Sequence, residues 1–310
     1  MSEDKYRLVT RSDFDGLVCA VLLKERDLID DILFVHPKDV QDGKVEITDR
    51  DITTNVPYSP KAHLVLDHHA SEAVRIGGTK PNLVLDPDAP SATRVVYRHF
   101  GGKAAFPKIS EALLAAVDAL DAAHLTKQEI LDPQGYILLG LLMDSRTGLG
   151  RFHDFGVSNY QLMMKLVDAC GRLDVDEVLA LPDVAERVQL YREHQQPFRN
   201  QLERCGTVHG NLVEVDLRNE ETIYAGNRFV IYALFPQCNI SMHVMWGRAK
   251  QNVVFAIGKS ILNRTSKTHV GNLALKYGGG GHEAAGTCQV DTDRAASVRE
   301  ELIRQITTDA

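Results

Sequence analysis

The chain is 310 residues long, which is the length of two domains of ordinary size. Hydrophobic residues make up 44% and charged residues 25% of the chain, as is typical of a soluble globular protein. The 42 acidic and 35 basic residues give a net charge of −7. This balance argues against a general basic surface for long nucleic acids, but it allows a short anionic ligand in a local basic pocket.

The five cysteines lie far apart and form no C-x-x-C pair, so neither a disulfide framework nor a zinc knuckle is indicated. The charged start, MSEDKYR, lacks the apolar core of a signal peptide. The longest apolar stretch, residues 136–143, is much shorter than the roughly 18 residues of a membrane span. We therefore expect a cytoplasmic protein with no membrane partner.

Short apolar runs alternate with polar turns in the first third of the chain. A segment with helical spacing, residues 17–26, follows the first run. The expected strands are residues 6–10, 31–36, 51–55, 63–67 and 82–86. Strands mixed with helices in this way favour an α/β fold with a parallel sheet covered on both faces.

The pattern from Ser91 to Leu181 is nearly all helical, and Ser158 is placed to cap one of the helices. The expected helices are residues 91–100, 109–123, 133–143, 159–170 and 174–181. A long polar segment follows at residues 185–205 and contains Pro197. It predicts a kinked connecting helix, which we take as the domain boundary.

Strand-like patterns return after Gly206 and predict a smaller α+β domain. The expected strands are residues 212–217, 228–235, 240–246 and 252–257, and the expected helices are residues 270–277 and 295–307. The predicted organisation is thus a first domain over residues 1–185, a connecting helix over 186–205 and a second domain over 206–310.

The first candidate site is S-D-F-D-G at residues 12–16, directly after a predicted strand. Asp13 and Asp15 are two residues apart, so on an extended chain their carboxylates point the same way. Two such carboxylates repel each other unless a cation lies between them. The alternative is that Asp15 only caps the next helix.

Two further clusters also follow apolar runs, where an open α/β sheet places its ligand site. L-D-H-H at residues 66–69 supplies two imidazoles, those of His68 and His69, for a metal or a phosphate. L-L-M-D-S-R-T at residues 141–147 places Asp144 beside Arg146. A helix end with a local ion pair is the alternative for Asp144.

The fourth cluster is G-G-G-G-H-E-A-A-G at residues 278–286. Its glycines would expose backbone N–H groups to a phosphate if the segment is a loop that enters a helix. Lys259 and Arg264 add positive charge upstream, although a solvated basic turn is an equal alternative. The candidate residues here are Gly278, Gly279, Gly280, Gly281, His282, Lys259 and Arg264.

These four motifs, in this order, resemble the DHH phosphoesterase family with its C-terminal DHH-associated domain. That family includes single-strand exonucleases of the RecJ type, nano-RNases that also dephosphorylate pAp, cyclic-di-AMP phosphodiesterases and exopolyphosphatase-like proteins. The resemblance implies a Rossmann-like first domain and a manganese-dependent hydrolase, with magnesium as the alternative ion and the site in the cleft between the domains. It implies that Asp13, Asp15, His68 and Asp144 bind metal, and that His69 and His282 contact the scissile phosphate.

The sequence departs from the family pattern at two positions. Arg11 or Val9 stands where the family has a metal-binding histidine. Asn55 stands where a bridging aspartate is usual, and we favour it over Asp49 and Asp51, which lie at or before the start of that strand. Two divalent cations would exceed the three remaining carboxylates by one charge, whereas one cation plus Arg11 balances them. We therefore expect one or two ions, with Arg11 directed at Asp13 or at a substrate phosphate.

The expected function is metal-assisted hydrolysis of a phosphate ester or phosphodiester in a small nucleotide or short single-stranded oligonucleotide. The glycine stretch would hold a terminal phosphate. Two alternatives stay open from the sequence: a non-hydrolytic relative that binds a phosphorylated metabolite, and an exopolyphosphatase-like activity. A homodimer is also open.

Overall fold

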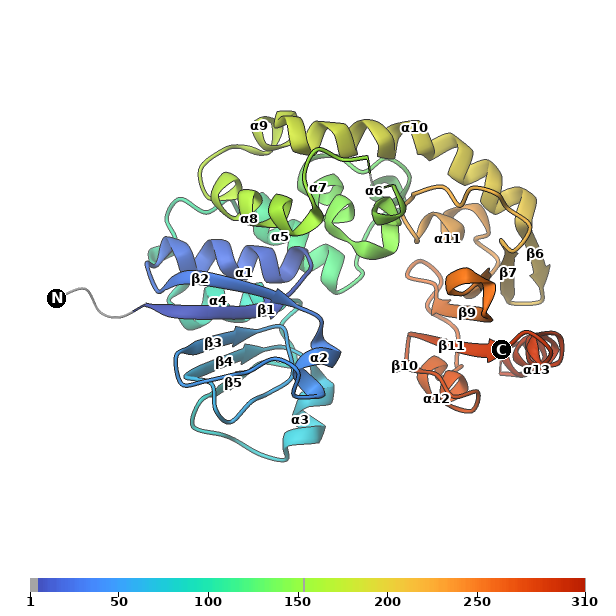
Figure 1. Cartoon of the computed structure of the whole chain (residues 1–310), viewed down its shortest axis with the longest axis horizontal. Coiled ribbons are helices and arrows are strands. Elements are labelled where there is room, and N and C mark those ends of the chain that lie inside the picture. Colours follow the sequence, from blue (N-terminus) through green and yellow to red (C-terminus); the bar gives the residue numbers. More distant parts are fainter. Residues whose placement is uncertain (1–4, 153, 310) are drawn as a thin grey trace. The chain divides into compact units, whose positions relative to one another are not determined.

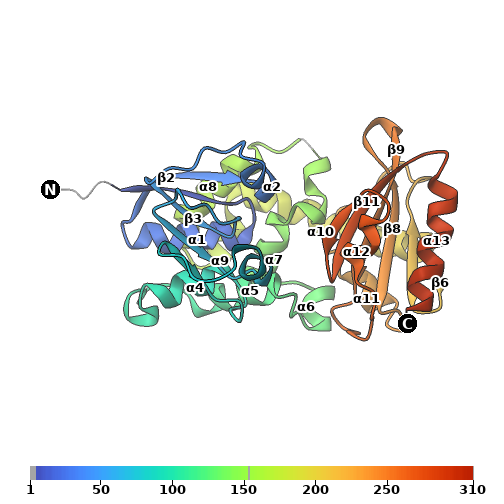
Figure 2. The ribbon, with the colours of Figure 1, turned by 90° about the horizontal axis from the view of Figure 1, so that it is seen from below.

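The computed structural model describes residues 5–152 and 154–309, which form two compact units (Figures 1 and 2). The first unit holds the described residues up to His124, together with Pro133–Ser145 and Leu149–Gln189. The second holds Leu125–Asp132, Arg146–Gly148 and the described residues from Leu190 onward. The boundary therefore falls inside helix α10, Pro182–Cys205, and two short segments from earlier in the chain belong to the second unit.

The sheet of the first unit is entirely parallel, with strand order β2-β1-β3-β4-β5. Its strands are β1 Tyr6–Arg11, β2 Ile29–Val35, β3 Asp51–Thr54, β4 Leu64–Asp67 and β5 Leu83–Leu85. All five predicted strands are thus confirmed. Because β2 and β3 lie on opposite sides of β1, the strand order reverses there, and ligands bind beyond the carboxyl ends of strands at such a point.

Helix α1, Phe14–Glu25, is buried over nearly its whole length because it packs against β1 and β2 and against three other helices, α4, α5 and α8. The remaining helices of this unit lie around this layer or at the strand ends (Figure 1). They are α2 Pro37–Gln41, α3 Ala70–Ile76, α4 Ala92–His99, α5 Glu111–Asp121, α7 Gly135–Met143, α8 Asn159–Cys170 and α9 Val175–Ala180. Ser158 caps α8 as predicted, through a reciprocal bond with Gln161.

The other face of the first sheet carries a smaller apolar cluster, which includes Val9, Ile47, Val56 and Val65. Val40 of α2 packs against this cluster, so a short helix and irregular chain cover this face. The sheet is covered on both faces, as predicted, but long helices form only one of the two layers.

The second unit contains a mixed six-stranded sheet in the order β10-β11-β9-β8-β7-β6. Its strands are β6 Gly206–His209, β7 Leu212–Asp216, β8 Ile240–Trp246, β9 Asn252–Lys259, β10 Gly280–His282 and β11 Ala285–Asp291. The helices are α6 Lys127–Leu131, α11 Val230–Leu234, α12 Val270–Leu275 and α13 Ala295–Thr308. Residues of β8, β9 and β11 share one buried core with α12 and α13.

One predicted strand of the second unit is wrong, because residues 228–235 contain helix α11 instead of a strand. The run is apolar throughout, and such a run does not distinguish a buried strand from a buried helix turn. Asn227 accepts a hydrogen bond from the backbone N–H of Phe229, which starts the turn. Tyr232 then reaches Ser241 and the carbonyl of Gly258, 2.9 and 2.8 Å away, so the helix is tied to the sheet by its side chain.

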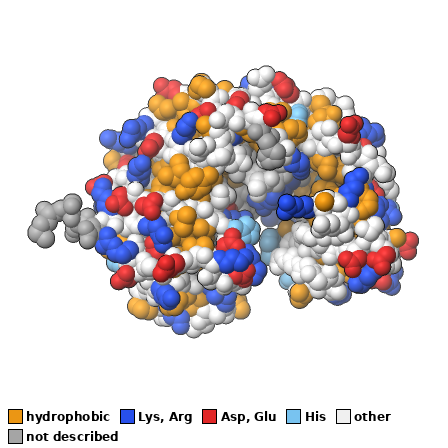
Figure 3. Space-filling view, in the orientation of Figure 1, with side chains coloured by type: hydrophobic (Ala, Val, Ile, Leu, Met, Phe, Trp, Pro, Cys, Tyr) orange, Lys and Arg blue, Asp and Glu red, His pale blue; other side chains and the backbone are white. Residues whose placement is uncertain are grey.

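Short 3-10 turns occur at Gly102–Ala104, Ser145–Thr147, Leu149–Arg151 and Arg248–Lys250. Within the described residues, no helix is both long and apolar enough to cross a membrane. On the face drawn in Figure 3, basic and acidic side chains are interspersed over both units, in keeping with the small net charge.

A close helix contact lies under the part of the first unit that carries the polar clusters. A Cβ at Gly140 of α7 would lie 2.2 Å from Leu120 Cδ1 of α5 and 2.7 Å from Phe14 Cδ1 of α1. Leu120 precedes Asp121, and Phe14 lies between Asp13 and Asp15. The missing side chain of Gly140 therefore lets the two helices that carry these acids come close to α7.

We predict that Gly140→Ala lowers the free energy of unfolding by about 1–3 kcal/mol, the usual cost of overpacking a core. This loss should exceed the gain of about 1 kcal/mol in helix propensity. Gly150→Ala is the matched control, because its Cβ would meet only Asn159 Nδ2 at an ordinary 3.8 Å. Urea unfolding measures both, and equal stability of the two variants would contradict this account of α7.

Candidate functional site

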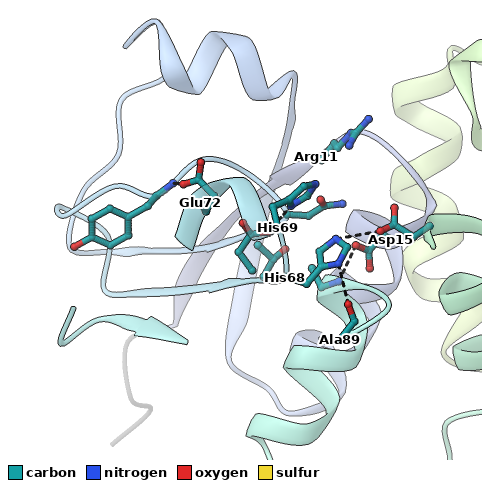
Figure 4. Close-up of polar contacts among 12 residues, drawn as sticks. Arg11, Asp15, His68, His69, Glu72 and Ala89 are labelled. Atoms are coloured by element: carbon teal, nitrogen blue, oxygen red, sulfur yellow. Dashed lines mark hydrogen bonds and ion pairs between the residues drawn. The ribbon is translucent and has the colours of Figure 1, made fainter. Parts of the chain in front are cut away.

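Polar side chains of the first unit converge where β1, β3 and β4 end (Figure 4). Arg11 ends β1, Asn55 follows β3, and Asp67 ends β4 just before His68 and His69. Asp121, the last residue of α5, joins them from another element. The parallel sheet thus brings together residues that are far apart in the sequence.

Asp15 does not cap its own helix, because α1 begins at Phe14 and Asp13 is the N-cap. Asp15 is buried, and its carboxylate accepts hydrogen bonds from the backbone N–H groups of Ala92, at 2.9 Å, and Thr93, at 2.8 Å. It therefore caps the N-terminus of α4 instead. Burial, then the nearby charges of Asp121 and Asp13, raise the pKa of Asp15, while His68 opposes this rise.

His68 lies between backbone and carboxylate partners. Its Nδ1 is 3.2 Å from the carbonyl of Ala89, and its Nε2 is 3.0 Å from Asp121 Oδ2. Burial opposes protonation, but contact with Asp121 and the charge of Asp15 raise the pKa of His68 to about 9. The approach to Asp121 lacks hydrogen-bond alignment, so Nε2 is a buried nitrogen without a hydrogen-bond partner among the described residues.

Two groups of side chains in the described residues have the composition and spacing of a metal site. Asp15, His68 and Asp121 form one, and Asp67, His68 and His69 form the other, with the ligand atoms of each group within 4.8 Å of one another. Asp67 Oδ2 is a second buried atom that finds no hydrogen-bond partner in the part of the chain described. Carboxylate oxygens with one imidazole suit manganese or magnesium better than a soft metal, so Asp15, His68 and Asp121 fit such an ion.

Arg11, Asp13 and Asn55 form a tight group next to these candidates. Arg11 Nε lies 2.8 Å from Asp13 Oδ2, while Asp13 Oδ1 accepts from Gly16 N–H at 2.9 Å and Asn55 Nδ2 at 3.2 Å. Both oxygens of Asp13 are therefore engaged by the protein's own donors. Asn55 has φ of +56°, a left-handed conformation that asparagine tolerates better than most residues.

Asp49 and Asp51, the two alternatives to Asn55 as the position of the bridging aspartate, lie at the other end of β3. Asp51 begins β3, and its carboxylate receives Arg7 Nε at 2.7 Å. It is thus at the opposite end of the strand from Asn55. Asp49 precedes that strand as well.

Asp144 follows α7 as its C-cap and is half-buried, but it belongs to neither group of metal-ligating side chains found among the described residues. Asp121 and Asp67 were not singled out from the sequence. Asp67 had a visible signal, since it is an acid that ends an apolar strand. Asp121 had a weaker signal: the helix dipole disfavours a carboxylate in the last turn of a helix, so an acid at that position suggests a role outside the helix.

His69 has one ring nitrogen fixed by the protein. Its Nδ1 lies 2.8 Å from Asp67 Oδ1, and the described residues offer no partner to Nε2. Burial acts against the charged ring, but Asp67 outweighs it and raises the pKa of His69. The ring is thus oriented by Asp67 and presents Nε2 to a ligand.

The glycine stretch of the second unit differs from the expected loop. It follows α12 and forms β10, which pairs with β11, so it does not enter a helix. Antiparallel pairing requires close backbone approach here: a Cβ would lie 2.1 Å from Thr287 O at Gly279 and 2.2 Å from Ala285 O at Gly281. Gly280 has open space around its Cβ position, and Gly278 has φ of +76°.

The other predicted residues of the second unit lie around this hairpin. Lys259 ends β9 and has its Nζ 3.2 Å from Glu283 Oε1. Arg264 donates from Nε to the carbonyl of Ile261 at 3.2 Å, and His282 Nδ1 accepts from the N–H of Ala284 at 3.2 Å. The basic side chains and the glycine hairpin therefore belong to one unit.

The His68–Asp121 pair predicts a pH dependence of stability in metal-free protein. The pKa of His68 is about 9 in the folded chain and near its ordinary 6.5 when unfolded, so the pair's contribution is complete below about pH 6.5 and is lost as the pH rises through 9. We expect the free energy of unfolding, measured in urea with chelator, to fall more steeply above neutral pH in the parent than in Asp121→Asn. Parallel slopes would contradict the pairing.

Neither a protein-family model nor a curated protein sequence matches the chain. Among solved structures, the pGpG-specific phosphodiesterase PggH from Vibrio cholerae is 59% identical, with a TM-score of 0.89 over 99% of this chain and all of that one. RecJ from Thermus thermophilus, in complex with Mn2+, is 14% identical, with a TM-score of 0.50 over 97% of this chain and 52% of that one. CDC45 from Entamoeba histolytica is 9% identical, with a TM-score of 0.52 over 98% and 95%.

The last two similarities concern the fold alone, whereas the first extends over the full chain at high identity. Together with the four motifs in order and the parallel sheet whose strands β1 and β4 lead into the first two of them, they identify the family. The chain belongs to the DHH phosphoesterase family, in company with the pGpG-specific phosphodiesterase of Vibrio cholerae.

Proposed function

We propose that this phosphoesterase hydrolyses the linear dinucleotide pGpG to two molecules of GMP. The observation that carries the proposal is the 59% identity to a pGpG-specific phosphodiesterase over the length of both chains. The site supports it, because buried acids and histidines that suit a hard divalent cation lie beside histidine and arginine donors that suit a phosphate. The net charge of −7 also favours a short substrate over a long nucleic acid.

We propose that Asp15, His68 and Asp121 hold one ion, manganese or magnesium. When bound, such an ion polarises a phosphoryl oxygen and makes a water molecule more acidic. His68 must lose its proton to act as a ligand. The neighbouring carboxylates that now stabilise its positive charge would then stabilise the charge of the bound cation instead. Asp121 here takes the role that the sequence assigned to Asp144.

The Arg11–Asp13 ion pair supports one ion rather than two. Asp13 would have to release Arg11 and Asn55 before its carboxylate could serve a second cation. The guanidinium already supplies a positive charge at that place, and Asn55 contributes none. Asp13, itself held by Asn55, is therefore proposed to hold Arg11 in place of a second cation.

In the proposed reaction, a water oxygen bonds to the phosphorus between the two nucleosides, and the bond from phosphorus to the 3′ oxygen breaks. The water proton is lost to solvent, and the departing 3′ oxygen gains one, which leaves two GMP molecules. His69 Nε2 and Arg11 donate to the phosphate oxygens and offset the charge that develops on them. In the second unit, Gly278–Gly281, His282, Arg264 and Lys259 are proposed to bind phosphate.

The first test measures metal binding and hydrolysis together. Chelator-treated protein should bind manganese in calorimetry and then convert pGpG to GMP. Mutation of residues that only hydrogen-bond to metal ligands typically lowers metal affinity roughly 10- to 100-fold. Asp121→Ala and Asp15→Ala, which remove proposed ligands, should lower manganese affinity by more than this. Asp144→Ala, an acid at the end of the neighbouring helix, is the control and should retain binding.

Two results would overturn these assignments. If Asp144→Ala loses the ion and Asp121→Ala keeps it, the ligand set is wrong. If the parent hydrolyses pAp or polyphosphate but leaves pGpG intact, the substrate is wrong.

The second test concerns the glycine hairpin. Gly280→Val adds a side chain into open space, so the melting temperature should change little. If the hairpin receives phosphate, the added side chain should raise the KM for pGpG about 10-fold or more by obstructing close approach. Gly281→Val is the contrasting variant and should unfold at lower temperature, because its Cβ meets Ala285 O. Unchanged KM in Gly280→Val would make the hairpin purely structural.

A further inference from the structure

A pocket of about 330 Å³ opens next to His69, on the side of that residue where α2 and α3 lie. Its walls come from the ends of β1, β3 and β4 and from the two helices. In Figure 4 His69 is drawn between Arg11 and Glu72, both of which line this pocket. The volume lies at the small end of the range for ligand sites, which suits one part of a nucleotide rather than a whole dinucleotide.

Two arginines enter this pocket, and each is anchored by a carboxylate. Arg75 Nε donates to Glu72 Oε1 at 2.8 Å, and its Nη2 also contacts Glu72. Arg11 Nε is held by Asp13. Glu72 in turn accepts a hydrogen bond from the N–H of Tyr58 at 2.9 Å, which fixes the carboxylate that orients Arg75.

The anchored arginines keep donors for a ligand. Nη1 of Arg75 and both Nη atoms of Arg11 contact no acceptor within the described residues, and the side chains are 44% and 36% exposed. The one further contact of Arg75, from Nη2 to the carbonyl of Tyr58, is long at 3.5 Å. With Nε and one N–H of Nη2 held by Glu72, the Nη1 of Arg75 and the remaining Nη2 N–H, which reaches Tyr58 O only at 3.5 Å, form the planar pair of donors that faces a ligand.

The pocket also offers an acceptor and apolar walls. Asn55 Nδ2 faces the carboxylate of Asp13, which fixes the direction of the amide. Asn55 Oδ1 is therefore a true acceptor, and it is buried with no hydrogen-bond partner among the described residues. Pro37, Val56 and Pro57 supply apolar surface.

This combination matches a purine better than a phosphate. A phosphate has only acceptors, and it would not use Asn55 Oδ1 or the apolar walls. Guanine has flat apolar faces, N–H donors on one edge and two acceptors, O6 and N7, on the other. A two-pronged arginine contact to O6 and N7 is the commonest specific contact to guanine.

We propose that this pocket binds one guanine base of the substrate and that Arg75 is a specificity-determining residue, donating to O6 and N7. Glu72 is a positioning residue that holds Arg75. Arg11 lies toward the end of β1, where it meets the phosphate attached to that nucleoside. The inference rests on the proposed function and adds to it the part of the protein that selects guanine.

The test compares pGpG with pApA and with pGpG carrying 7-deazaguanine, which lacks the N7 acceptor. The parent should prefer pGpG over both in kcat/KM. Arg75→Ala should reduce the preference over pApA by roughly 10- to 100-fold, as expected for a two-pronged contact, mainly through KM. The same variant should respond little to 7-deazaguanine, because the partner of N7 is already gone.

Two further variants separate geometry from charge. Arg75→Lys keeps the positive charge but not the planar pair of donors, so it should behave like Arg75→Ala. Arg98→Ala is the matched control, since Arg98 lies on α4, forms an exposed ion pair with Asp86 and does not line the pocket. Calorimetry of pGpG binding in chelator, where no turnover occurs, should show weaker binding for both Arg75 variants and parent-like binding for Arg98→Ala.

The outcomes distinguish this inference from the function on which it rests. If the parent does not hydrolyse pGpG, the proposed function fails, whatever the pocket does. If the parent prefers pGpG and Arg75→Ala keeps the same preference over pApA, only the pocket assignment fails. If Arg75→Ala instead loses the preference for pGpG over GpG, the pocket binds the terminal phosphate and the guanine assignment is overturned.

Discussion

The buried carboxylate of Asp15 is the constraint on which the site of the first unit depends. It joins the N-terminus of α4 to the first turn of α1 and at the same time faces His68 and Asp121. Burying a charge costs free energy unless donors or a counter-charge offset it. The backbone N–H groups of α4 offset part of this cost, and the positive ring of His68 offsets another part. A bound cation would take over from that proton.

A second carboxylate shows how this chain departs from its family. Asp13 is engaged by Arg11, Gly16 and Asn55, so its charge is already balanced by the protein. The same arginine lines the pocket beside His69, where Arg75 is held in a similar way by Glu72. Anchored guanidinium groups keep their orientation without a ligand, which lowers the entropy lost when one binds. Arg11 thus connects the proposed metal site to the pocket beside it.

The outcome for the second unit shows where local pattern is insufficient. Alternation and turn residues located β8 and β9, because each has one face in the core and one outside it. The uniformly apolar run 228–235 has no such alternation, and it folds as α11 because Asn227 and Tyr232 are bonded there. The glycines after α12 pair with β11 instead of starting a helix. Glycine permits both conformations, so only the partner strand decides between them.

By itself the sequence determined the class of the fold, the five parallel strands and the order of the four motifs. These follow from periodicity and residue type, which are local properties. Tertiary structure alone decided that Asp121 lies with Asp15 and His68, and that Arg75 shares a pocket with Arg11. Such contacts depend on how helices such as α5 and α7 pack, here through the missing side chain of Gly140. Packing of this kind is set by many distant residues together, so no single motif records it.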